Sequence, residues 1–208
     1  MKNLSALLVL TFIFVSAGCI KHEIIPPPLP EVELNSIFTA TINGEEVMLR
    51  DGVDGMEGNA TQIKEIFPSP QPSTVVYYAE MRSDLVNNFI QLAMGKLAFQ
   101  PEESLEPSKT AFESYFVSNI EPNFSQEANS GVMITYVDTQ GIIWRSDSGS
   151  EGPKSFIFSS LEYDEDDRGE YMKFTANFTC NLYNNLTNPT ESDTLVVENA
   201  VYTNYFKR

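Results

Sequence analysis

Apolar and polar residues alternate along most of the chain beyond residue 36, which is the spacing of extended strands with one buried face. The longest such run is YMKFTANFTCNLY, residues 171–183, where every second side chain from Met172 to Leu182 is apolar. The same period predicts strands over 36–42, 45–50, 74–83, 89–99, 132–136, 142–144, 156–163, 171–183 and 195–206, the last as one or two strands.

Turn signals separate these strands. Asn43-Gly44 between two alternating runs is typical of a two-residue hairpin, because both residues tolerate a positive φ. The glycine-rich stretch 51–60 lacks the ligand spacing of a calcium-binding loop, so we expect a solvated turn there. Prolines interrupt the pattern over 68–73, and residues 138–141 have the composition of a further hairpin turn.

One segment, 108–118, changes period. Ser108 is placed to cap a helix, and four apolar residues then recur at helical spacing. These are Ala111, Phe112, Tyr115 and Phe116. We therefore predict one short amphipathic helix that packs on a sheet by its aromatic rings. About ten strands, hairpin connections and this helix indicate a single all-β domain over 36–208, folded as an antiparallel β-sandwich or flattened barrel.

The first nineteen residues, MKNLSALLVLTFIFVSAGC, end in a cysteine. A basic residue, an apolar run over 7–15 and small residues are typical of a cleaved export signal, and the run is shorter than the roughly 20 residues of a membrane-spanning helix. Because the small residues lead directly into Cys19, the stretch resembles the lipobox of bacterial lipoproteins, whose cysteine is acylated. We therefore expect a signal peptide over 1–18, followed by a lipid anchor and proline-rich tether over 19–35. An ordinary secretory signal is the alternative.

The amino-acid composition excludes several classes of functional site. Removal of the signal changes the formal net charge from −16 to −17, because it takes away one lysine and no acid, and such acidity is not expected of a protein that binds nucleic acid. The only histidine, His22, precedes the domain, which excludes histidine-dependent triads and metal sites from it. With Cys19 acylated, Cys180 is the only thiol, and its apolar strand face predicts an inert core residue. We predict no cofactor.

Several stretches carry a family resemblance. They are FTATINGEEV, AFESYF, GVMITYVDTQGIIW, and YMKFTANFTCNLY followed by LVVENAVYTNYF. Together with the lipobox, they make the chain similar to a family of lipoprotein domains of unknown function from Bacteroidota-type Gram-negative bacteria. The resemblance implies an all-β, membrane-tethered envelope protein and brings no catalytic residues. Ile20 after the cysteine implies the outer membrane, with the periplasmic face and the cell surface both left open.

An acidic turn is the first candidate site. It contains four consecutive carboxylates, Asp164, Glu165, Asp166 and Asp167, whose oxygens suit a hard cation such as Ca²⁺. A solvated hairpin tip is the interpretation we prefer, because no glycine defines a ligand geometry within the run. A separate triplet, Asp193-Thr194-Leu195, resembles the acceptor sequence for O-glycosylation of exported proteins in these bacteria, which makes Thr194 a candidate for that modification.

The second candidate site is aromatic. Large rings offer wide contact area to sugars, and five of them would form a platform if they shared one sheet face. The five are Trp144, Tyr136, Tyr77, Tyr78 and Tyr163. For Trp144 and Tyr136 we favour core packing, because both lie in a strongly apolar alternation.

These features favour a non-catalytic binding or structural module, held on the lipid bilayer through acylated Cys19. Its partner would be a glycan or another envelope protein. The first alternative is a carbohydrate-binding lipoprotein of a glycan-uptake system. The second is a glycoside hydrolase, which needs two carboxylates and no histidine, although the acids outside the turns show no paired spacing.

Overall fold

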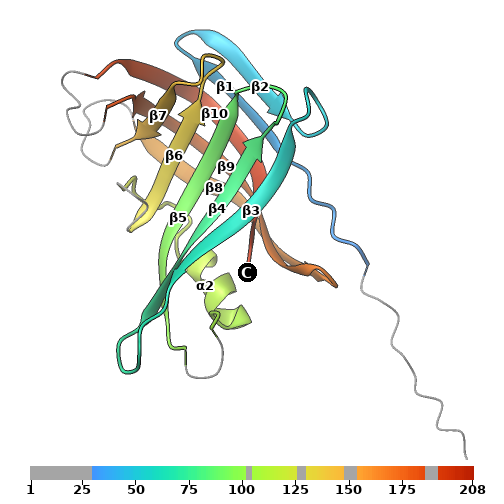
Figure 1. Ribbon diagram of the computed structural model, residues 1–208, viewed down its shortest axis with the longest axis vertical. Helices are drawn as coiled ribbons and strands as arrows, with labels where there is room; N and C mark the ends of the chain where they lie inside the picture. The colour runs from blue at the N-terminus through green and yellow to red at the C-terminus, as the bar shows by residue number, and fades with distance from the viewer. Residues whose placement is uncertain (1–29, 102–104, 126–129, 148–153, 186–191) are drawn as a thin grey trace, which may run out of the picture.

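The computed structural model describes residues 30–101, 105–125, 130–147, 154–185 and 192–208, so Cys19 and most of the proline run lie outside the described residues. The described part is an all-β domain of ten antiparallel strands and one helix (Figure 1), which confirms the predicted fold class. The strands are β1 (Ile37–Ile42), β2 (Glu45–Arg50), β3 (Glu57–Glu65), β4 (Ser73–Arg82), β5 (Phe89–Phe99), β6 (Gly131–Val137), β7 (Ile143–Ser146), β8 (Ser155–Asp166), β9 (Gly169–Tyr183) and β10 (Thr194–Lys207).

All ten strands belong to one sheet that does not close into a barrel. Its order is β2-β1-β10-β9-β7-β6-β5-β4-β3. The strand β8 lies off this path: it pairs with β9 from Gly169 to Thr179, and β7 pairs with the same edge of β9 farther along, at Leu182 and Tyr183.

The sheet folds over, so that β3 and β4 reach β10. There the Tyr205 hydroxyl donates to the Gly58 carbonyl at 3.1 Å, and the Asn204 amide donates to the Glu80 carbonyl at 3.1 Å. The two outermost strands are therefore β2 and β3.

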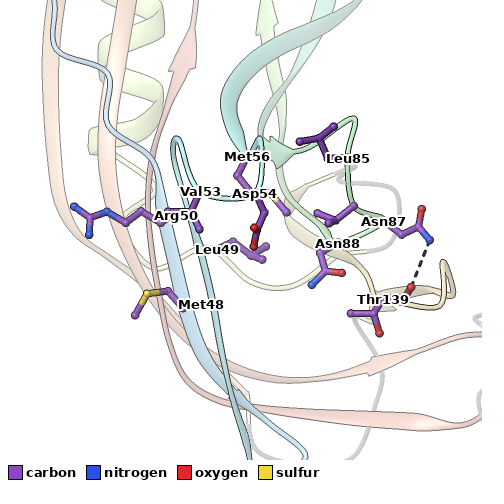
Figure 2. Close-up of a pocket in the computed structure, with 11 residues that line it drawn as sticks. Met48, Leu49, Arg50, Val53, Asp54, Met56, Leu85, Asn87, Asn88 and Thr139 are labelled. Atoms are coloured by element: carbon purple, nitrogen blue, oxygen red, sulfur yellow. Dashed lines mark hydrogen bonds between the residues drawn. The ribbon is translucent and has the colours of Figure 1, made fainter.

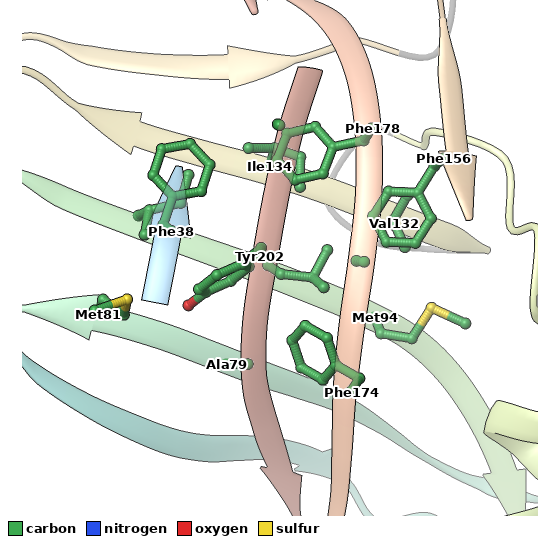
Figure 3. Packing of buried hydrophobic residues seen from close by; sticks show 14 of the residues in the cluster. Phe38, Ala79, Met81, Met94, Val132, Ile134, Phe156, Phe174, Phe178 and Tyr202 are labelled. Carbon is green, nitrogen blue, oxygen red and sulfur yellow. The ribbon is translucent and has the colours of Figure 1, made fainter. Parts of the chain in front are cut away.

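The inner face of the folded sheet is an apolar core rich in aromatic rings (Figure 3). The predicted face of β9 is buried from Met172 to Leu182, as its period of two requires. Phe38 meets Tyr202 edge-to-face at 5.8 Å between ring centroids, and Phe174 stacks on Phe206 at 4.8 Å. This core fixes the register of the strands, because a slip by one residue would expose every apolar side chain.

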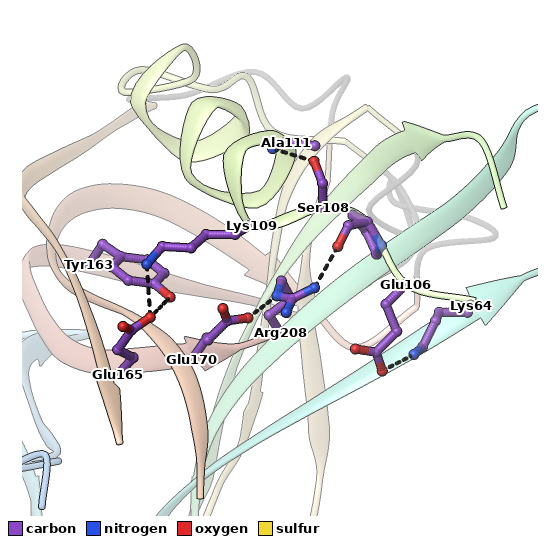
Figure 4. Close-up of polar contacts among 10 residues, drawn as sticks. Lys64, Glu106, Ser108, Lys109, Ala111, Tyr163, Glu165, Glu170 and Arg208 are labelled. Carbon is purple, nitrogen blue, oxygen red and sulfur yellow. Dashed lines mark hydrogen bonds and ion pairs between the residues drawn. The ribbon is translucent and has the colours of Figure 1, made fainter. Parts of the chain in front are cut away.

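The helix α2 (Lys109–Val117) covers one end of this core. Ser108 is its N-cap, and the Ser108 hydroxyl accepts from the Ala111 N–H at 3.2 Å (Figure 4), as predicted. Phe112 and Phe116 are fully buried, and the Phe116 ring stacks on Phe206 at 4.7 Å. No helix in the described part of the chain is long and apolar enough to cross a membrane.

Two details differ from the sequence prediction, and a third, the number of C-terminal strands, which the sequence predicts as one or two, is decided by the structure. The turn that we expected over 51–60 ends at residue 55, and β3 follows it. We did not predict this strand, because it is an edge strand and its residues do not alternate clearly between buried and exposed. The C-terminal segment is one strand, whose register shifts between Val197 and Ala200. The strands β8 and β9 extend into the predicted acidic turn, so only two residues connect them.

Candidate functional site

A groove of about 440 Å³ opens at one end of the sheet (Figure 2). It lies between the end of β2, the turn at 51–55, the β4–β5 loop at 83–88 and the β6–β7 turn. Its lining residues are Met48, Leu49, Arg50, Val53, Asp54, Met56, Leu85, Val86, Asn87, Asn88 and Thr139. The volume falls within the roughly 300–1,000 Å³ of small-ligand sites.

The first two of these loops are fastened to each other. The Ser83 hydroxyl donates to the Asp54 carbonyl at 2.7 Å and accepts from the Leu85 N–H at 3.0 Å. Gly55 has φ +69°, a conformation that favours glycine, and a Cβ there would lie 2.9 Å from Leu85 Cδ1 and displace that side chain. The loops are therefore held in place before any ligand arrives.

The third loop is fixed by Asp138. Its carboxylate accepts from the backbone N–H of Gln140 at 2.9 Å and of Ile142 at 3.0 Å, and from the Trp144 ring N–H at 2.9 Å. Partial burial raises the pKa of Asp138, but the hydrogen bonds from Trp144 and the backbone outweigh it, so the pKa lies below its usual range. The neighbouring Thr139 carbonyl accepts from the Asn87 amide at 3.4 Å, which joins this turn to the 83–88 loop.

The groove has an apolar rim and polar groups in its lining. Leu85 is 77% exposed, and Met48, Val53 and Val86 are also exposed around it, whereas Leu49 and Met56 form a buried floor. Within the part of the chain that the structure describes, the charged lining residues are Arg50 and Asp54, and no aromatic ring lines the groove. It therefore offers both apolar and polar contacts, and polar groups make up the larger part of its exposed lining. The single carboxylate of the described lining does not form the pair that a glycoside hydrolase uses.

The five predicted aromatic candidates do not gather into one platform. Tyr77, Tyr136 and Trp144 are buried in the core, which confirms core packing for the last two. Tyr136 and Trp144 are direct cross-strand neighbours on β6 and β7. Tyr78 is half-buried on the outer face of the sheet. Tyr163 is half-buried beneath Lys109, whose ammonium group lies 4.3 Å from the ring centroid (Figure 4).

The predicted acidic turn is neutralised by basic side chains. Lys173 pairs with Asp164 at 3.0 Å, and Lys109 pairs with Glu165 at 2.8 Å. The fourth acid, Asp167, is exposed. Within the ranges that the structure describes, no group of three or more histidine, cysteine, aspartate or glutamate residues is arranged to hold a metal ion.

Asp166, the third acid of this run, holds the N-terminal segment. Its buried carboxylate accepts from the Val32 N–H at 3.0 Å and from the Arg168 N–H at 2.8 Å. The Val32 bond is the main reason why the pKa of Asp166 falls to about 2, and Arg168 lowers it further against the effect of burial. Arg168 also pairs with Glu31 at 2.7 Å. The turn therefore holds residues 31–32, near the end of the predicted tether, against the domain, a role that we did not predict.

Two further predictions concern single residues. Cys180 is buried, which confirms the predicted core position. Burial also raises the pKa of its thiol to about 12, and its lack of reactivity stays a prediction. Thr194, the candidate for O-glycosylation, is the exposed first residue of β10. Its modification stays a prediction.

The groove was not predicted from the sequence. We predicted 51–60 as a solvated turn and gave no role to the link between β4 and β5. The sequence feature that could have indicated the groove is Leu85-Val86, because these two apolar residues lie in a short polar connection where burial is not expected. That they border the same groove as Met48 depends on how the sheet folds over, which the local pattern does not encode.

A second feature outside the predictions is a polar ladder on the outer face. The Glu80 carboxylate is buried there and accepts from the Asn59 amide at 3.0 Å and from the Gln91 amide at 3.2 Å. These three residues are cross-strand neighbours on β3, β4 and β5. Tyr78 lies two residues from Glu80 on the same strand and therefore on the same face.

No protein-family model, curated protein or solved structure matches this chain.

Proposed function

We propose that this chain is a lipid-anchored protein of the bacterial outer membrane, and that it presents a non-catalytic binding module to another envelope protein. The lipobox that ends at Cys19 supports the anchor. The described N-terminal segment supports the presentation, because it leaves the domain beside the β8–β9 turn (Figure 1) and none of its residues lines the groove. Attachment to the bilayer thus leaves the groove uncovered by that segment.

The groove at the end of the sheet is the binding site in this proposal. The observation that carries it is the set of exposed apolar side chains on its rim, of which Leu85, Val53 and Val86 lie on loops that are already fastened together and Met48 lies on β2. Exposed apolar clusters mark protein interaction sites, and fixed loops reduce the entropy lost on binding. Among the described residues no aromatic ring lines the groove, which favours a protein segment with both apolar and polar side chains over a sugar as the occupant.

Site-specific photo-cross-linking tests this proposal in cells that express the full chain. A benzophenone amino acid replaces Leu85, and the control variant carries it at Ile157, which is an exposed apolar residue on β8 outside the groove. We expect a discrete cross-linked species from position 85. Adding Val53→Glu should remove that species, because a charge on the rim disfavours apolar contact. No species from position 85, the same species from position 157, or no effect of Val53→Glu would each overturn the groove as the site.

The anchor is tested separately by metabolic labelling with radioactive palmitate. The wild-type chain should be labelled and recovered with outer membranes, whereas the Cys19→Ala chain should carry no label and should not be recovered with them. Equal labelling of the two would remove the anchor from the proposal and leave the groove experiment unaffected.

A second candidate function is glycan binding on the outer face, supported by the polar ladder beside Tyr78. The Asn59 and Gln91 amides are oriented by Glu80 and keep further donors and acceptors for sugar hydroxyls, while the half-exposed Tyr78 ring offers a stacking surface. Affinity electrophoresis against a panel of bacterial and plant polysaccharides is the test. Tyr78→Ala should lose retardation and Tyr163→Ala should keep it. A wild-type chain that no polysaccharide retards would rule this function out.

A further inference from the structure

The strand β2 ends the sheet on one side, and within the described residues no strand pairs with its outer edge. Unpaired edges are usually protected by charged residues, prolines or bulges, because they pair readily with other chains. Here the middle of the edge is Met48, whose side chain is 66% exposed. Val47 and Leu49 pack toward the core on the other face. The edge is therefore short, apolar at its centre and open.

The hairpin geometry shows which backbone groups face outward. Asn43 and Gly44 have φ values of +48° and +84°, as in a two-residue turn whose flanking residues form a hydrogen-bonded pair. Such pairs recur every second residue, so the odd-numbered residues of β2 direct their N–H and C=O groups to β1. The backbone groups of Glu46, Met48 and Arg50 therefore face the free edge, and their side chains share the outer face of the sheet.

We propose that two copies of this chain pair through β2, antiparallel about a two-fold axis, with Met48 opposite Met48 of the second copy. In this register each Glu46 lies opposite Arg50 of the second copy, so two pairs of opposite charge flank the central methionines. The outward-facing backbone groups of all three residues meet their counterparts and exchange two hydrogen bonds per pair. Two sheets thus become one continuous sheet.

Charge selects this register over its neighbours. Hydrogen-bond parity and face parity allow registers centred on any residue from Glu46 to Arg50. Centring the pair on Val47 or Leu49 would place Met48 opposite a charged residue. Centring the pair on Glu46 would oppose two glutamates, and centring it on Arg50 would oppose two arginines. Like charges directly opposite each other destabilise a strand pair, whereas opposite charges stabilise it. Only the register centred on Met48 places glutamate against arginine.

Cysteine cross-linking in cells that express the full chain tests the pairing. Opposed residues of a hydrogen-bonded antiparallel pair lie about 5.5 Å apart at Cα, within the range of a disulfide, so Met48→Cys should yield an oxidant-dependent dimer. Ile63→Cys is the matched control, because Ile63 is 59% exposed and lies on β3, the other outermost strand. The native Cys180 is buried and does not contribute. A missing dimer at position 48, or an equal dimer at position 63, would overturn the proposal.

A charge exchange tests the register itself in the Met48→Cys background. Glu46→Arg or Arg50→Glu alone turns both attractive pairs into repulsive ones and should lower the dimer yield about ten-fold. The double variant Glu46→Arg/Arg50→Glu restores opposite charges and should recover the dimer. Failure of the double variant to exceed both single variants would exclude this register. Met48 and Arg50 also line the groove, but the readout here is a disulfide between two copies at β2, whereas the groove experiment detects a different protein at position 85. The two proposals can therefore fail separately.

Discussion

Replacing Trp144, the only tryptophan of the chain, by alanine tests whether this ring is a structural or a ligand-contacting residue. The ring is 6% exposed, belongs to the main core cluster and donates its N–H to Asp138 at 2.9 Å. It therefore connects the core to the turn that borders the groove.

The expected loss of stability follows from this burial. A buried aromatic ring removes roughly 150–250 Å² from water, which at about 25 cal/mol per Å² corresponds to about 4–6 kcal/mol. Alanine keeps about 1 kcal/mol of this as a buried methyl group, which leaves about 3–5 kcal/mol, the range observed for large aromatic truncations in cores. Trp144→Phe keeps most of the ring and loses the bond to the partly exposed Asp138, so it should cost only about 1–2 kcal/mol.

Urea unfolding followed by far-ultraviolet circular dichroism measures both variants, since removal of the only tryptophan rules out a fluorescence readout. The midpoints should fall in the order wild type, Trp144→Phe, Trp144→Ala. A Trp144→Ala chain within 1 kcal/mol of wild type would refute the core assignment. If that stable chain had also lost glycan binding, the ring would be a ligand contact.

Three further predictions follow from single contacts. The pKa of Asp166 is held at about 2, so the stability that its carboxylate contributes is complete above the usual pKa of an aspartate and is lost as the pH falls from about 4 toward 2. The urea midpoints of the wild type and of Asp166→Asn should therefore converge over that pH range. Cys180 should react with iodoacetamide only after unfolding, and labelling of the native chain would contradict its burial. Gly58→Ala should lower the midpoint, because a Cβ would lie 1.9 Å from Ser36 Oγ, and Ser36→Gly should partly restore it.

The core strands were predictable because each has a buried face on one side. In β9 the apolar period persists from Met172 to Leu182, and in β4 every second residue from Val75 to Met81 is buried, so the local pattern alone identifies strand and face. The helix was predictable for the same reason, since Ser108 caps it and its aromatic rings recur at helical spacing.

The candidate sites were not predictable in this way. The strand β3 lies at the edge of the sheet and packs against one neighbouring strand only. Its alternation of apolar and polar residues is therefore weak. The groove joins residues from three connections that are distant in sequence, such as Asp54 and Thr139. Asp166 looked like part of a solvated tip, because its partner Val32 is 134 residues away and no local signal links them. Long-range contacts of this kind arise from the folded sheet.

Pairing through β2 and attachment through Cys19 support each other if both proposals hold. The paired segment has only six residues, and interfaces below about 1,200 Å² are generally weak in free solution. Two copies anchored in one membrane are confined near each other, which raises their effective concentration without any new contact. In cells, Cys19→Ala should therefore reduce the Met48→Cys dimer while the β2 edge itself is unchanged, and Glu46→Arg should reduce it in both backgrounds. Equal dimer yields with and without Cys19 would show that pairing gains nothing from the anchor and that the edge alone holds the two copies.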